Sequence, residues 1–195
     1  MSLVFVLGNG VSRQSIDPTQ LKALAPVYGC NALYRDFVPD VLIATDRPIA
    51  EHIQNSGYSA SNRFYTRNPI AGLGARKIPK EYWTFSSGPA AVGIAAEADH
   101  NTIYIIGFDM GPTETNRFNN MYSDTEFYKS SAANPTYAGN WVRQLQHITK
   151  KFSDKRFVRV MGAATASIAG LENIKNLTHL PIGEFLLRIN NKKDL

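Results

Sequence analysis

The sequence is poor in cysteine, and its few histidines are dispersed. Cys30 is the single cysteine among 195 residues, so no disulfide can form within the chain, and we expect it to be a small core residue. None of the histidines forms the closely spaced pair typical of a structural zinc site: His52, His100, His147 and His179. We therefore expect no metal site and assign no histidine to catalysis.

Long apolar runs are also absent. None approaches the roughly 20 residues that a membrane-spanning helix needs. The apolar start, residues 1–7, is too short for a signal peptide and lacks a basic residue. Aromatic RNA-binding motifs are missing as well, so nucleic acid is not an expected partner. These absences predict a cytoplasmic protein without a transmembrane segment.

What is present is the composition of a globular domain. Hydrophobic residues make up 44% and charged residues 19%, which argues against disorder. We expect one domain over residues 1–189, followed by a flexible tail over 190–195. The net charge of +5 suits an anionic ligand, although mildly basic domains without such a ligand are equally common.

Strand and helix patterns alternate along the chain. Short apolar runs predict buried strands over 3–7, 27–30, 41–44, 63–66, 102–106 and 157–160, the last strand of the chain. Start signals and helical spacing predict helices over 18–25, 46–55, 86–98, 137–152 and 166–171, with a loop over 68–82. This order predicts a doubly wound, Rossmann-like α/β fold with a mostly parallel sheet and helices on both faces.

Polar residues and glycines follow the predicted strands at the point where each strand ends. They are Gly8, Asn9, Gly10, Asn31, Asp46, Ser87, Gly107 and Asp109. The carboxyl ends of parallel strands meet at one edge of a sheet, where α/β proteins bind their ligands. The sequence therefore predicts a ligand site at this edge.

The turn Gly8-Asn9-Gly10-Val11-Ser12 is the first candidate for binding a phosphate. Glycines after a strand let the backbone approach a phosphate with its amides pointing at it. The dinucleotide fingerprint is incomplete because Arg13 occupies the third glycine position, and no Walker lysine follows. A tight turn without a ligand is the alternative.

Each of the other candidates has a structural alternative. Residues 86–88 form either a phosphate-binding helix start, through Ser86, Ser87 and Gly88, or a plain N-cap. Asn31 contacts a base or sugar, or is a left-handed turn residue. Asp46 is a catalyst or an N-cap, and Asp109 orients a hydroxyl or caps the next turn.

The polar segment over about 110–136 is too long for an ordinary connection. It is therefore either a functional lid or disordered. Tyr122, Tyr128 and Tyr137 lie in or beside it, where they cover a ligand or anchor the loop.

Four segments together resemble a family of bacterial glycosyltransferases. They are residues 6–12, Tyr28-Gly29-Cys30-Asn31, Ser86-Ser87-Gly88 and Ile105-Ile106-Gly107-Phe108-Asp109. In this order they are similar to the bacterial sialyltransferases that build lipooligosaccharide termini from CMP-sialic acid. Motility-accessory-factor proteins and archaeal hydroxymethylpterin diphosphokinases are more distantly similar. The resemblance spans about residues 4–171.

The resemblance implies a Rossmann-like, metal-independent homo-oligomer without a cofactor, which uses a CMP-sugar as donor and a glycan as possible acceptor. Asn9 and Asn31 would contact the nucleotide, Ser87 its phosphate, and Asp46 the sugar or nucleotide. The segment over 110–136 would close over the donor, with tyrosines that stabilise the departing phosphate; they are Tyr122, Tyr128 and Tyr137.

The chain departs from this family at two places. The family's general base, a histidine, is replaced by Asn140 in the stretch 136–140, and Asn140 does not accept a proton near neutral pH. Thr84 stands where the family has a basic residue. A transferase would then use Asp109, Asp46 or the acceptor itself as base. A nucleotide-binding protein with degraded chemistry, a pterin-type diphosphotransferase and an empty vestigial cleft remain alternatives.

Overall fold

A computed structural model describes residues 2–191. It contains one open sheet of eight parallel strands in the order β5-β4-β3-β2-β1-β6-β7-β8. The strands are β1 (Leu3–Leu7), β2 (Val27–Cys30), β3 (Val41–Ala44), β4 (Phe64–Thr66), β5 (Arg76–Lys77), β6 (Thr102–Ile106), β7 (Arg156–Met161) and β8 (Leu177–Pro181). The predicted Rossmann-like α/β fold is confirmed.

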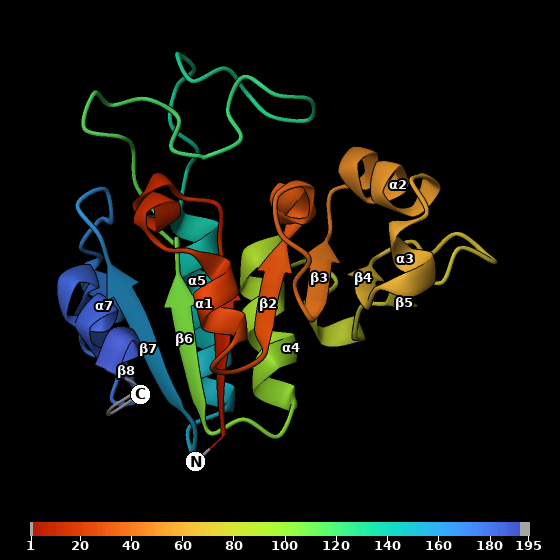
Figure 1. The fold of residues 1–195 in the computed structure, drawn as a ribbon. Coiled ribbons are helices and arrows are strands. Elements are labelled where there is room, and N and C mark those ends of the chain that lie inside the picture. Colours follow the sequence, from red (N-terminus) through yellow and green to blue (C-terminus); the bar gives the residue numbers. More distant parts are fainter. Residues whose placement is uncertain (1, 192–195) are drawn as a thin grey trace.

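The helices lie on both faces of this sheet (Figure 1). They are α1 (Pro18–Lys22), α2 (Arg47–Asn55), α3 (Tyr58–Ser61), α4 (Ser87–Glu97), α5 (Gly139–Lys151), α6 (Ala169–Glu172) and α7 (Ile182–Asn191), with three short 3-10 helices, η1 (Val11–Ser15), η2 (Asn31–Arg35) and η3 (Lys80–Tyr82). Alternate residues of β1 point to opposite faces and divide the core: Val4 and Val6 pack with α4 and α5, whereas Phe5 and Leu7 pack with α1, α2 and α7.

Small residues bring α4 close to the sheet, as its composition predicts. Every residue of α4 from Pro89 to Ala96 is buried. A Cβ added at Gly93 would lie 2.5 Å from the ring of Tyr82, so this position accepts only glycine without rearrangement. The close packing fixes the amino end of α4 against the carboxyl ends of β1, β2 and β3.

The aspartates that precede α1 and α2 differ in how they cap these helices. Asp17 caps α1, because its carboxylate accepts a hydrogen bond from the Thr19 amide at 2.8 Å. Asp46 occupies the N-cap position of α2, but its side chain makes no capping hydrogen bond. The carboxylate of Asp46 is therefore left for another role.

The prediction that the sheet ends at 157–160 is wrong, because β8 follows β7 and pairs with it in parallel. The loop prediction over 68–82 is also incomplete, since β5 and η3 lie within it. In addition, α7 extends through Asn191, so the first two residues of the expected tail are helical; residues 192–195 lie outside the described chain.

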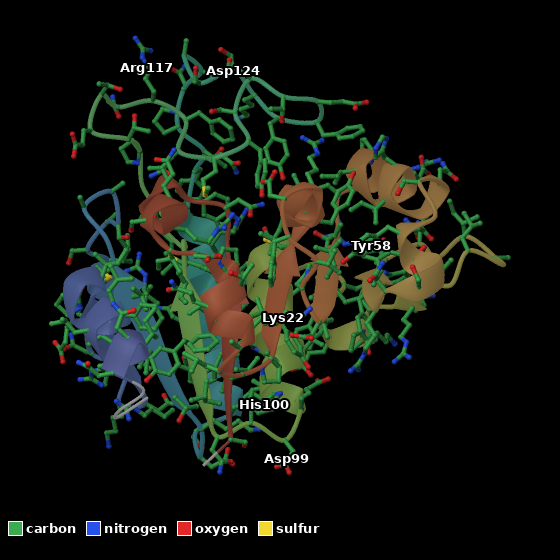
Figure 2. All side chains as sticks on the ribbon, viewed as in Figure 1. Lys22, Tyr58, Asp99, His100, Arg117 and Asp124 are labelled. Atoms are coloured by element: carbon green, nitrogen blue, oxygen red, sulfur yellow. The ribbon has the colours of Figure 1, made fainter. Side chains whose placement is uncertain are left out.

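The segment over 110–136 contains no regular helix or strand and crosses above the carboxyl edge of the sheet (Figure 1). Arg117 and Asp124 mark its outermost part (Figure 2). It is held to the body by specific hydrogen bonds, including one from the Met121 amide to the Asn9 carbonyl at 2.8 Å. Across residues 2–191, we find no helix with the length and apolar character needed to cross a membrane.

Candidate functional site

A cavity of about 330 Å³ lies at the carboxyl edge of the sheet, beneath residues 110–136. It lies where the chain order reverses, because β1 has β2 on one side and β6 on the other. This is the usual ligand position in open parallel sheets. The structure brings most of the predicted site residues to its wall: Gly8, Asn9, Gly10, Asn31, Asp46, Ser86, Ser87, Gly88, Gly107, Asp109, Tyr137 and Asn140.

Four of the five backbone amides in the Gly8–Ser12 turn donate to other parts of the protein. Gly8 donates to the Ile106 carbonyl at 2.8 Å and Gly10 to the Gly107 carbonyl at 2.9 Å. The amide of Val11 donates to Asn119 Oδ1, and that of Ser12 donates to Asp109 Oδ2. These four donors are therefore not available to a phosphate in this conformation.

The glycines of this turn are required by contact between two loops. A Cβ at Gly8 would lie 2.5 Å from the Gly107 carbonyl oxygen, and one at Gly10 would lie 2.5 Å from the Asp109 carboxylate. Gly107 itself has φ +72°, a left-handed conformation that favours glycine. Close approach of the turns after β1 and β6 thus explains this pattern without any ligand.

Asp109 is buried and serves as an acceptor for protein donors. Its carboxylate accepts from the Ser12 amide at 3.0 Å, from the Ser12 hydroxyl, and from the Thr165 hydroxyl at 3.1 Å. Its backbone carbonyl accepts from the Ala166 amide. The side chain ties the β1 turn to the loop after β7, and its lone pairs are largely occupied.

Two buried guanidinium groups hold the same turns. Arg13 is 4% exposed and its Nε donates to the Gly8 carbonyl at 2.8 Å. Arg159 is fully buried and donates to the carbonyls of Phe108 and Ala166. Burial lowers the pKa of Arg159 to about 10, so it remains charged at neutral pH. Asp109 is the buried carboxylate beside these two cations, and Asp46 adds an exposed carboxylate at the cavity wall.

Asn9 and Asn31, which line the cavity, each have a buried amide oxygen without a hydrogen-bond partner within the described residues. Asn9 is 7% exposed, and its Nδ2 donates to the Cys30 carbonyl at 3.1 Å, but its Oδ1 is buried and unpartnered. Asn31 Oδ1 is likewise buried and unpartnered, on a backbone with φ 51°. Buried polar atoms without partners are uncommon in folded proteins, and both of these belong to residues that line the cavity.

The amino end of α4 also faces this cavity. The Ser87 hydroxyl accepts from the Thr45 amide at 2.9 Å and contacts the Thr45 hydroxyl at 3.0 Å, so it is engaged with β3. Ser86 makes no side-chain cap. The amides of Ser87 and Gly88 are in the first helical turn, where no intrahelical acceptor exists, and both residues line the cavity. They are backbone donors at a helix amino end, a position that favours an anion.

The remaining predicted residues of the cavity wall differ in exposure and in whether their side chains are hydrogen-bonded within the protein. Asp46 is exposed, and within residues 2–191 its carboxylate makes no hydrogen bond or ion pair. Tyr137 is 72% exposed at the cavity wall. Asn140 Oδ1 accepts a hydrogen bond from Arg143. Asp46 is therefore the one predicted carboxylate in the cavity that is free to act on a ligand.

Three predicted residues lie outside the cavity wall. Ser12 faces a neighbouring cavity, whereas Tyr122 and Tyr128 are anchored among the buried residues beside β1 and β2. The Tyr128 hydroxyl accepts from the Ala32 amide at 3.2 Å, and burial raises its pKa. In this conformation these two tyrosines anchor the segment, which is the structural alternative for them.

Sequence reasoning missed the apolar part of the wall. Phe108, Met110, Phe118 and Trp141 line the cavity. Phe118 is one of the few aromatic residues in the segment 110–136, so its sequence position is the one signal that pointed to it. The helical spacing of Trp141 predicts a core position in α5, and only the three-dimensional structure shows that this residue lines the cavity.

Cys30 lines the cavity, but its thiol is not reactive. Burial raises the pKa of its thiol to about 12, so it stays protonated at neutral pH. Within residues 2–191, His, Cys, Asp and Glu side chains form no group of three that could hold a metal ion. Comparison of the chain with protein-family models, curated proteins and solved structures finds no match.

Proposed function

We propose that this cavity binds a nucleotide and that the protein is a metal-independent transferase for a nucleotide-activated sugar, with a CMP-sugar as donor. The observation that carries the proposal is that Asn9 and Asn31, two residues of the cavity wall, each have a buried, unpartnered amide oxygen, and that the same wall contains the amino end of α4. One side of the site needs a hydrogen-bond donor, and the other offers donors to an anion.

A nucleotide matches both requirements. Its exocyclic amino group or ribose hydroxyls can donate to Asn9 Oδ1 and Asn31 Oδ1, which relieves the cost of leaving buried acceptors unpaired. Its phosphate can accept from the Ser87 and Gly88 amides, where the helix dipole also favours negative charge. This arrangement transfers the expected phosphate contact from the Gly8–Ser12 turn to α4.

For transfer, Asp46 is the group that could serve as base. Asp109 is occupied by three protein donors, and Asn140 has no titratable proton acceptor near neutral pH. Asp46 is exposed at the cavity wall without a partner in residues 2–191. A specific observation favours a second candidate, a nucleotide-binding protein without transfer: the position of the family histidine holds an asparagine that is bonded to Arg143.

The pterin-type diphosphotransferase is less well supported. Among the described residues, no lysine or arginine side chain lines the cavity. Transfer from a triphosphate relies on cations or metal ions that neutralise the developing charge. A site with two helix amides suits one phosphate better.

A thermal-shift titration with CMP, CDP, UDP, GDP and ADP, with and without magnesium, tests the proposal. A ligand at a hundred times its dissociation constant stabilises a protein by about 2.7 kcal/mol. We expect a shift with CMP that does not require magnesium. No shift with any nucleotide would overturn nucleotide binding, whereas binding without donor hydrolysis would favour the second candidate.

A matched pair of variants locates the site. Asn31 and Asn116 both have left-handed backbones, with φ 51° and 56°, but only Asn31 lines the cavity. Asn31→Gly keeps that backbone and removes the amide, and we expect CMP affinity to fall about fivefold, the equivalent of a hydrogen bond of about 1 kcal/mol. Asn116→Gly should bind CMP like the wild type. Equal affinity in both variants would refute the assigned contact.

A further inference from the structure

A second cavity of about 530 Å³ opens beside the first, on the β7 and β8 side of the β1 turn. Residues of η1, the segment 113–115, the loop 162–164 and the first residue of α7 line it. Its volume lies in the range of small-molecule sites.

The two cavities share a thin wall. Asn119 lines the first cavity, while its Oδ1 accepts from the Val11 amide at 2.9 Å and its Nδ2 donates to the Ala164 carbonyl at 3.4 Å. Val11 and Ala164 line the second cavity. Asp109 lines the first cavity and Ser12 lines the second, and the Ser12 amide donates a hydrogen bond to the Asp109 carboxylate between them. The second cavity is thus a separate compartment with its own lining.

Several polar side chains of this lining are exposed. Gln14, Ser15 and Glu114 are exposed, and their side chains have no partner within residues 2–191. An amide, a hydroxyl and a carboxylate together offer donors and acceptors to neighbouring hydroxyl groups. No lysine or arginine belongs to the described lining, and Glu114 repels anions, so a phosphate or a sialic acid is disfavoured.

Apolar groups form most of the accessible surface of the lining. Val11, Ala164 and Ile182 are half-buried, and no aromatic side chain lines the cavity within the described residues. Aliphatic carbons suit the C–H face of a saturated ring, whereas the lack of an aromatic partner removes the stacking that a planar base would use. This surface differs from that of the first cavity, where aromatic side chains and helix amides meet.

We propose that this second cavity binds a neutral carbohydrate through Gln14, Ser15 and Glu114. The ligand class follows from the hydroxyl-matching polar groups, the aliphatic wall and the absence of cations. The proposal does not depend on nucleotide binding in the first cavity.

Saturation-transfer NMR with lactose, maltose and cellobiose tests it. We expect saturable transfer to at least one disaccharide in the wild type and none in Ala163→Trp, which places an indole in the cavity. Ala71→Trp, at an exposed position in the loop 68–75, adds the same indole elsewhere and should behave like the wild type. Gln14→Ala, at an exposed position with little risk to folding, should weaken binding about fivefold.

Several outcomes would overturn the proposal. They are no saturable transfer with any of the three sugars, equal binding by Ala163→Trp and the wild type, and tighter binding of glucose 6-phosphate than of glucose. The CMP thermal shift of Ala163→Trp is measured in parallel. If CMP still stabilises this variant and no sugar binds to the wild type, the results contradict only the proposal for the second cavity.

Discussion

Replacement of Gly8 by alanine tests directly why the turn after β1 contains glycine. In the structure, a Cβ at this position would lie 2.5 Å from the Gly107 carbonyl oxygen, 2.8 Å from Phe108 Cδ2 and 3.0 Å from the Gly107 carbonyl carbon. Two of these atoms belong to the backbone of the turn after β6. The alanine methyl group can therefore fit only if the two turns move apart.

The expected cost is that of overpacking a tight contact, about 1–3 kcal/mol of unfolding free energy. Separation of the turns would also weaken the Gly8 to Ile106 hydrogen bond, which is 2.8 Å long. In a chain of this size, each kcal/mol lowers the melting temperature by roughly 2–4 °C. Urea denaturation without a ligand measures this loss of unfolding free energy, provided that the variant and the wild type show the same dependence of that free energy on urea concentration.

Gly183→Ala is the matched control. It adds the same methyl group at a position in α7 where, among residues 2–191, no atom beyond the chain neighbours and the nearby helix backbone lies within 4 Å, and φ is not left-handed. Because alanine is the better helix former, we expect unchanged or slightly higher stability, by at most about 1 kcal/mol. If Gly8→Ala is as stable as the wild type but no longer binds CMP, the glycine serves the ligand and not the contact between turns.

Two further predictions concern side chains whose surroundings are known in detail. Ser87→Ala should lower the unfolding free energy by about 1–3 kcal/mol, because the buried Thr45 amide loses its acceptor. Ser86→Ala should change the unfolding free energy little, since the Ser86 side chain makes no capping hydrogen bond. Chemical denaturation measures both variants, and equal losses of stability would contradict the assigned roles. His100 lies at the far end of the molecule from residues 117 and 124 (Figure 2), and its pKa is lowered by burial and by nearby Lys155. The unfolded chain then binds this proton more readily, so stability falls as the pH drops below about 6.5. His100→Gln should reduce this loss of stability between about pH 7 and 5, and an unchanged pH profile would refute the assignment.

Much of the fold could be predicted because buried parallel strands are short apolar runs. The runs at 3–7, 27–30, 41–44 and 102–106 all form central strands. The edge strand β8 was missed because Thr178 and His179 interrupt its apolar pattern, and only part of it is buried. The two residues of β5 are too few to give a pattern.

The location of the candidate site could be predicted from the sequence, but the hydrogen bonding of its residues could not. Convergence of polar residues at one sheet edge follows from topology, and it brought Asn9, Asn31 and Asp46 to one cavity. Which donors remain free depends on contacts between residues far apart in sequence, such as Ser87 with Thr45. No local pattern shows that four of the five turn amides are hydrogen-bonded within the protein and that the Asp46 carboxylate is not.

An amide NMR titration of the isotope-labelled protein with CMP, without metal ions, tests the central claim most directly. The proposed site predicts saturable shifts at the backbone amides of Ser87 and Gly88 and at the Asn31 side chain. Either no saturable shift up to millimolar CMP, or saturation that shifts only residues of the second cavity such as Ser15 and Thr115, would contradict it.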